Sequence, residues 1–414
     1  MVYNARLPLV ACMLALGAVT VGGACSSRPS GSGTAATGSG GAGASGTSSA
    51  SGTLAVGSGG AGSAGVSGGS SSSGGPILSD GGLPTACPAS AAGNTPTGQD
   101  TMSPGSVTSF TYTNVGSAGA YDKVVSGWSK ATGCVSDPSG MLCDTTYRMP
   151  VQVSGPITPF DEDLSMVFGG PLELYQIAVY APSGGDWQQA AYWDRCTTEG
   201  LAFVGNKSWY ECGGFVQSYV TADGTAESAA SVQFAGSIPA GTEVNVMSDA
   251  MCTGADCGWS SGLALKGFSG DAAGSKIFVT KFRMPISTST PAYWILPGQV
   301  LRSSQYGCNC REEGCDATYK GGCGELDVVE VTGGVATTLV ASTSIYSYQN
   351  CFGGVGQWDR PVNETATFVV IVDAPSKQIG IRRLGATDFD FAGTIPAATV
   401  SGWLAEKGGT RAMQ

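Results

Sequence analysis

The chain contains no histidine among its 414 residues. Histidine is the base in Ser-His-Asp and Cys-His catalysis, so its absence excludes both arrangements. Any zinc site would have to be built from cysteine and carboxylate ligands. Chemistry carried by Asp and Glu remains compatible with this composition, because paired carboxyl groups can act as acid, base and nucleophile without histidine.

Charged residues are also scarce, at 12% of the chain, and their formal net charge is −11. An acidic, charge-poor surface repels nucleic acid and offers little attraction to an anionic substrate. A neutral polysaccharide suits such a surface better.

The N-terminal apolar run, from Leu7 to about Val21, is too short for a transmembrane helix and is typical of a signal-peptide core. It ends in Gly22-Gly23-Ala24-Cys25, which resembles a bacterial lipoprotein cleavage site, although Gly22 stands where leucine is usual. We predict a signal peptide at 1–25 with Cys25 as the lipidated first residue of the mature protein. Membrane contact would then come only through this anchor. The alternative is ordinary secretion with Cys25 unused.

Residues 26–86 consist almost entirely of Gly, Ser, Ala and Thr. Such a segment cannot bury enough apolar surface to fold, so we predict a disordered linker. At about 5–6 Å times the square root of its length, it would span roughly 40 Å on average.

Cysteine is abundant, with 14 residues, of which Cys12 lies in the signal segment and Cys25 is the lipidation candidate. The remaining twelve are an even number in an exported chain, which predicts disulfide bonds. For the cluster from Cys308 to Cys323, a cysteine-rich metal site is the alternative.

From about residue 105 onward, short alternating strands separated by Gly and Pro predict an all-β protein. We expect a small β domain at 87–185 and a jelly-roll β-sandwich at 186–414. A helical pattern is confined to Thr399–Lys407. The acidic run Asp161–Asp163 predicts a solvated loop, with a calcium site as the alternative.

Three carboxylates alternate with aliphatic residues in the segment Glu325-Leu326-Asp327-Val328-Val329-Glu330. Alternate residues of a strand share a face, so Glu325 and Asp327 point together, whereas Glu330 would point to the other side. A β-bulge at Val328–Val329 would absorb one residue and return Glu330 to the shared face. We therefore predict a bulged strand with three acids on one face. The alternative is an exposed strand that alternates acidic and apolar residues.

Such a cluster has the composition that glycoside hydrolysis needs. Crowded carboxyl groups raise one another's pKa. A retaining glycosidase uses an ionised carboxylate as nucleophile and a protonated carboxyl as general acid, about 5 Å apart. A third acid between them can hold a shared proton and keep the pair in different states.

The order Glu-Leu-Asp-Val-Val-Glu resembles the active-site signature of family 16 glycoside hydrolases in its bulged form. Upstream, Pro291–Gly298 resembles the strand of that family that carries a substrate-stacking tryptophan, here Trp294. The resemblance implies a family-16-like jelly-roll with a glucan cleft. It also implies Glu325 as nucleophile, Asp327 as helper acid and Glu330 as acid/base.

A second resemblance is carried by several segments: Tyr112–Gly116, Gly119–Tyr121, Pro156–Ser165, Gly170–Leu172, Ala178–Tyr180, Tyr306–Cys310 and Gly322–Glu325. They resemble fungal target-of-SBF cell-wall proteins, in which a glycine-rich-protein domain precedes a family-16-like glycosidase domain. The resemblance covers about residues 105–400. This chain departs from those proteins in its bacterial-looking N-terminus and in the insertion-like Arg311–Gly314.

Aromatic side chains near the acids are candidate substrate contacts, because sugar rings offer apolar C–H faces to them. Trp294 is the first candidate, with Tyr293 facing the opposite side of the same strand. Trp358 and Trp259 lie in loop-like segments and are further candidates. For each of these two, ordinary packing is the alternative.

The sequence thus predicts an exported, lipid-anchored β-glucan hydrolase with a retaining two-carboxylate mechanism, and resemblance alone implies the β-1,3 linkage. We expect no cofactor, no catalytic metal and no nucleic-acid partner, and a monomeric protein. The alternatives are a transglycosylase on the same scaffold, a non-catalytic polysaccharide-binding protein and a structural protein of the cell envelope.

Overall fold

The computed structural model describes residues 107–125, 148–211, 214–303, 305, 309–311, 322–332, 337–406 and 408–413. The predicted signal peptide at 1–25, the lipidation candidate Cys25 and the linker at 26–86 lie outside the described residues. None of the helices in the described part of the chain is long and apolar enough to cross a membrane.

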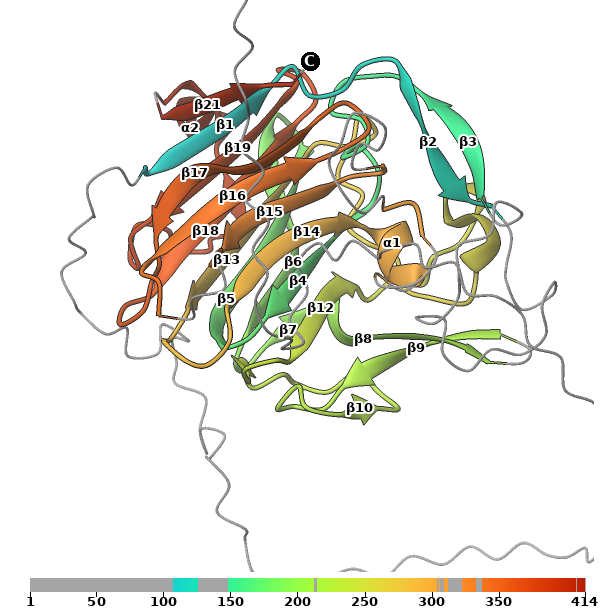
Figure 1. Ribbon diagram of the computed structural model, residues 1–414, viewed down its shortest axis with the longest axis horizontal. Helices are drawn as coiled ribbons and strands as arrows, with labels where there is room; N and C mark the ends of the chain where they lie inside the picture. The colour runs from blue at the N-terminus through green and yellow to red at the C-terminus, as the bar shows by residue number, and fades with distance from the viewer. Residues whose placement is uncertain are drawn as a thin grey trace, which may run out of the picture. The chain divides into compact units, whose positions relative to one another are not determined.

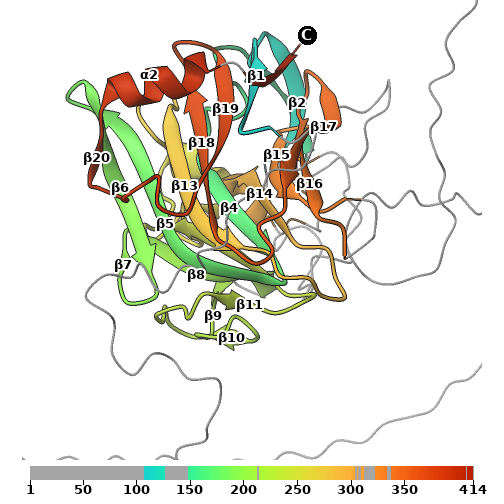
Figure 2. The ribbon, with the colours of Figure 1, turned by 90° about the vertical axis from the view of Figure 1, so that its left-hand side faces the viewer.

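Two large sheets face each other across the core (Figure 1, Figure 2). In the ten-stranded sheet, β1 and β21 pair in parallel, and the neighbouring strand pairs at the centre are antiparallel. Its strands in spatial order are β20 (Thr394–Ile395), β6 (Asp186–Asp194), β5 (Leu172–Ser183), β13 (Lys276–Arg283), β18 (Ala366–Asp373), β19 (Gln378–Leu384), β1 (Ser109–Thr113) and β21 (Gly409–Ala412), with β11 (Ser237–Ile238) beside β5 and β7 (Thr198–Glu199) beside β6.

The nine-stranded sheet carries the acidic segment on β15, between β14 and β16. Its strands in spatial order are β10 (Glu227–Ser228), β9 (Gly214–Val220), β8 (Leu201–Glu211), β12 (Glu243–Ser248), β4 (Leu164–Gly169), β14 (Ala292–Pro297), β15 (Glu325–Glu330), β16 (Val340–Tyr346) and β17 (Cys351–Asp359). A separate hairpin is formed by β2 (Gly119–Val124) and β3 (Arg148–Val153).

Three short helices complete the described elements: the 3₁₀ helix η3 (Ala255–Ser260), α1 (Gly298–Arg302) and α2 (Ala397–Ala405). Through Val400, α2 joins the apolar cluster on the outer face of the ten-stranded sheet (Figure 2). The predicted helix at 399–407 is therefore confirmed, beginning two residues earlier than expected.

The central strands of the ten-stranded sheet are apolar on both faces because both faces are covered. On β13, Phe278 belongs to the main core between the sheets, whereas Ile277 belongs to the outer cluster beneath α2. Val370 and Val369 of β18 divide between the two clusters in the same way. The predicted all-β sandwich is confirmed.

The predicted boundary between domains at 87–185 and 186–414 does not separate the strands. From the first segment, β4 lies between β12 and β14, and β5 lies between β6 and β13. Either segment alone would leave strand edges unpaired at the centre of both sheets. In the described residues from 107 onward, strands of both segments thus lie side by side in each sheet.

Within β15, the structure contains the predicted bulge. Against β16, Asp327 pairs with Ser344 and Glu330 with Ser342, so three steps on β15 match two steps on its neighbour. Against β14, the register shifts at the same place. The extra residue lies at Val328–Val329, and both valines are fully buried in the core. The bulge prediction is confirmed.

A buried hydrogen-bond chain joins the two sheets at this bulge. Thr343 Oγ1, on β16, donates to the backbone carbonyl of Asp327 at 2.6 Å. The hydroxyl of Tyr112, on β1, lies 3.1 Å from Thr343 Oγ1. A bulge disrupts the local ladder, so a carbonyl there needs another donor, and Thr343 supplies it.

We expect Thr343→Val to lower the free energy of unfolding by about 1–3 kcal/mol, because it leaves the buried Asp327 carbonyl without this donor. Urea denaturation of the purified protein measures the change. Thr367→Val is the matched control, since the buried Thr367 hydroxyl has no hydrogen-bond partner among the described residues. That control should be neutral or stabilising. Equal losses in both variants would contradict the assigned role of Thr343.

Candidate active site

The acids of β15 share the face that points away from the core. Leu326, Val328 and Val329 are fully buried in the main cluster between the sheets. Glu325 and Asp327 are 8% and 6% exposed, and Glu330 is partly exposed. The bulge thus sorts the strand into apolar side chains on one face and acids on the other.

Proximity of the three acids changes their protonation. Burial raises the pKa of Asp327 well above its usual range, and the charges of Glu325 and Glu330 raise it further. Burial and the charge of Glu325 also raise the pKa of Glu330. Arg311 opposes both increases. The cluster therefore retains protons at pH values where isolated carboxyl groups have lost them.

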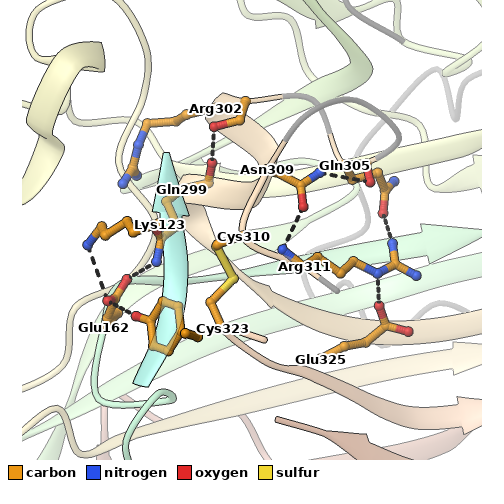
Figure 3. Close-up of a disulfide and its surroundings, with 12 residues drawn as sticks. Lys123, Glu162, Gln299, Arg302, Gln305, Asn309, Cys310, Arg311, Cys323 and Glu325 are labelled. Atoms are coloured by element: carbon orange, nitrogen blue, oxygen red, sulfur yellow. Dashed lines mark hydrogen bonds and ion pairs between the residues drawn. A yellow bond between two sulfur atoms is a disulfide. The ribbon is translucent and has the colours of Figure 1, made fainter. Parts of the chain in front are cut away.

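Arg311 contributes a cation to this cluster from outside the sheet. Its Nε forms an ion pair with Glu325 Oε2 (Figure 3). The residue before it, Cys310, is disulfide-bonded to Cys323, two residues before Glu325. The disulfide expected beside the acidic strand is confirmed. The position of Arg311 escaped sequence reasoning, because it depends on a cysteine pairing that the sequence leaves open.

Trp294 and Tyr293 point to opposite sides of β14, as predicted. Trp294 pairs across the sheet with Asp327 and belongs to the cluster on the outer face, with 7% of its surface exposed. Tyr293 is fully buried in the core and stacks on Phe168 at a ring-centroid distance of 4.8 Å. Trp294 is thus the tryptophan that the structure brings beside the acids.

Trp358 differs from the prediction. It lies on β17, is 0% exposed and packs edge-on against Phe368 in the core, so its assignment as a substrate contact is wrong. Trp259 lies in η3 and lines a pocket together with Gln299 and Arg302 of α1. The assignment of Trp259 as a substrate contact stays a prediction.

The acidic run at 161–163 is also not the solvated loop that was predicted. Asp163 is buried and forms an ion pair with Arg302 at 2.6 Å. Burial opposes its ionisation, but the Arg302 guanidinium outweighs that effect and lowers the pKa of Asp163. Glu162 accepts a hydrogen bond from the Tyr121 hydroxyl at 2.7 Å. These carboxylates fasten α1 and the β2–β3 hairpin to the start of β4.

The arrangement on β15 supports acid–base and nucleophilic chemistry at one place. It combines a carboxylate paired with a cation, a carboxyl that holds its proton, and a third acid with a raised pKa. Groups pushed into different protonation states are what general acid–base catalysis requires.

Comparison with known proteins identifies the family of this chain. The C-terminal family model of the cell wall protein YJL171C/Tos1 matches residues 185–403, and the N-terminal model matches residues 108–182. The resemblance to fungal target-of-SBF proteins is thereby confirmed. No solved structure matches the chain.

Two fungal relatives are similar over much of the chain. The Saccharomyces cerevisiae protein named "Probable circularly permuted 1,3-beta-glucanase TOS1" is 31% identical over 255 residues, which are 56% of this chain and 52% of that protein. The Candida albicans protein named "Probable circularly permuted 1,3-beta-glucanase PGA52" is 28% identical over 338 residues, which are 73% of this chain and 83% of that protein.

This chain therefore spans about half the length of the first relative. The C-terminal family model alone covers more than half of the 414 residues, and the N-terminal model extends the match toward residue 108. On this basis, the chain belongs to the YJL171C/Tos1 family of cell wall proteins.

Proposed function

We propose that this protein is an exported glycoside hydrolase that cleaves β-1,3-glucan with retention of anomeric configuration. The observation that carries the proposal is the β15 bulge, which gathers Glu325, Asp327 and Glu330 on one face. The printed names of both relatives support 1,3-β-glucan as the substrate class. The charge-poor composition of the chain suits a neutral polymer.

In the proposed mechanism, Glu325 attacks the anomeric carbon while Glu330 gives its proton to the departing glycosidic oxygen. A raised pKa suits Glu330 to this first role. The resulting glycosyl ester on Glu325 is then hydrolysed by a water that Glu330 deprotonates. Asp327, protonated and hydrogen-bonded to Glu325, keeps the pair in different states.

The proposed place of action is the cell envelope. The matched family is described as cell wall proteins, which supports export. The N-terminal sequence adds the proposal that Cys25 carries a lipid and that residues 26–86 hold the folded part away from the membrane.

A second candidate is a polysaccharide-binding protein without turnover. It is favoured by the low exposure of Glu325 and Asp327, 8% and 6%, which limits access to the acids. The two candidates differ in one measurement, the release of reducing sugar from β-1,3, β-1,4 and mixed-linkage glucans. Binding without release would favour the second candidate.

We expect Glu330→Gln to lower kcat/KM on a soluble β-1,3-glucan by about 10²–10⁴-fold, the usual contribution of a general acid. Glu325→Gln should lose at least as much, because it removes the nucleophile. Both substitutions preserve side-chain shape, so thermal unfolding can verify that the variants fold.

Glu173→Gln is the matched control for these variants. Glu173 also pairs with an arginine, Arg283 at 2.7 Å, but it lies on the ten-stranded sheet. Its turnover should equal that of the unmodified protein. Full activity in Glu325→Gln or Glu330→Gln would rule out the proposed mechanism.

Asp327→Asn should stabilise the protein near neutral pH and have little effect at pH 4. A carboxyl whose folded-state pKa is raised contributes stability below its unfolded pKa, and that contribution is lost as pH rises through the folded pKa. Asparagine is neutral at every pH and avoids this loss. We expect a rise in Tm of about 2–4 °C at pH 7, as for a gain of about 1 kcal/mol in a domain of this size.

Asp163→Asn should change stability at pH 7 in the opposite direction. The pKa of Asp163 is lowered by Arg302, so its contribution is present above the unfolded pKa and disappears as pH falls. This variant should lose stability at pH 7 and recover relative to the unmodified protein at lower pH. A Tm for Asp327→Asn below that of the unmodified protein at pH 7 would contradict a protonated Asp327.

A further inference from the structure

One disulfide bridge joins the strand that carries the acids to the segment that carries Arg311. Cys310 and Cys323 are bonded, and the Cys323 N–H also donates to the Cys310 carbonyl at 3.1 Å. Arg311 directly follows the first cysteine, and Glu325 lies two residues after the second. Between them, Gly324 has a φ of 102°, and a Cβ there would come within 3.1 Å of the Phe160 ring.

Buried polar contacts hold Arg311 from the other side. Its backbone N–H donates to Asn309 Oδ1 at 2.7 Å, and Asn309 Nδ2 donates to the Gln305 carbonyl at 3.1 Å. Gln305 Nε2 in turn donates to Glu243 Oε2 on β12 at 3.0 Å. Figure 3 shows the Arg311 guanidinium between the side chains of Gln305 and Glu325. Asn309 and Gln305 are both nearly fully buried.

The ion pair is only partly screened by solvent, since the Arg311 and Glu325 side chains are 24% and 11% exposed. Among the described residues, the other titratable groups that act on these acids are Asp327 and Glu330 on β15 and Tyr346 on β16. These three are acids, and Arg311 supplies a charge of the opposite sign. Without it, three crowded carboxyl groups would compete for the same protons.

We propose that Arg311 is a positioning residue that assigns the negative charge of the cluster to Glu325, and that the Cys310–Cys323 disulfide fixes it there. This inference rests on the proposed function, in which Glu325 must be ionised and aimed while Glu330 keeps its proton. It adds a determinant outside the acidic strand.

The test compares Arg311→Met with Arg311→Lys in the pH profile of kcat/KM on a soluble β-1,3-glucan. Arg311 lowers the pKa of Asp327 and Glu330, so removal of its charge raises both. We expect the alkaline limb of the profile, which reports the proton on Glu330, to move to higher pH by about one unit or more in Arg311→Met, as loss of an adjacent unit charge produces. Arg311→Lys keeps the charge, and its limbs should stay within a few tenths of a unit.

Arg283→Met is the matched control, because it removes an arginine from an ion pair with Glu173 on the other sheet. Its profile should coincide with that of the unmodified protein. The double variant Cys310→Ser/Cys323→Ser should move the alkaline limb in the same direction as Arg311→Met, since it releases the support of the cation. Equal loss of rate at every pH in Arg311→Met and Arg311→Lys, with no displaced limbs, would overturn the proposal.

Thermal unfolding against pH separates this inference from the proposed function, since it needs no substrate. A higher folded pKa of Asp327 and Glu330 makes stability fall more steeply as pH rises from 4 to 7, so the Tm of Arg311→Met should fall faster than that of Arg311→Lys. A steeper fall together with no glucan turnover by the unmodified protein would support the charge assignment and reject the glucanase. If the unmodified protein cleaves glucan but Arg311→Met changes neither the fall of Tm with pH nor the limbs of the kcat/KM profile, the role of Arg311 is rejected and the glucanase proposal stands.

Discussion

The extra residue at Val328–Val329 is the constraint on which the site depends. A regular strand would have put Val329 on the acid face and Glu330 in the core. With the bulge, the aliphatic residues of β15 fill the core while all three acids leave it. Thr343 then supplies the hydrogen bond that the bulged backbone needs, and Tyr112 links it to the opposite sheet. The same bulge therefore determines both the packing of the core and the placement of the acids.

Crowding three acids on one face opposes folding, because like charges in a desolvated place repel one another. Two features next to the acids reduce this repulsion. The raised pKa of Asp327 keeps its proton bound to a higher pH than on an isolated carboxyl, and Arg311 offsets the charge of Glu325. The disulfide beside Arg311 holds that cation close without requiring a basic residue on the sheet itself. An isolated salt bridge at the surface would add little, but this one is largely withdrawn from solvent.

Short sequence patterns were enough to predict the faces of the strands and the bulge. The period of two places Trp294 and Tyr293 on opposite faces, and the odd spacing of the acids reveals the bulge. Contacts between distant segments were not predictable in this way. The insertion of β4 and β5 among later strands, the burial of Trp358 and the pairing of Asp163 with Arg302 all depend on partners far away in sequence. Thr343 and Arg311 act on the acids from other elements, so no motif around β15 contains them.

The charge balance at the acids and the composition of the chain both favour a neutral substrate over an anionic one. The raised pKa values of Asp327 and Glu330, and the pairing of Glu325 with Arg311, reduce the negative charge of the site. An anionic polymer would be attracted by clustered basic residues, but only 20 of the 414 residues are Lys or Arg. A neutral polysaccharide needs hydrogen bonds and an aromatic surface, and Trp294 lies across from Asp327. This charge balance supports the neutral polysaccharide that we propose as substrate.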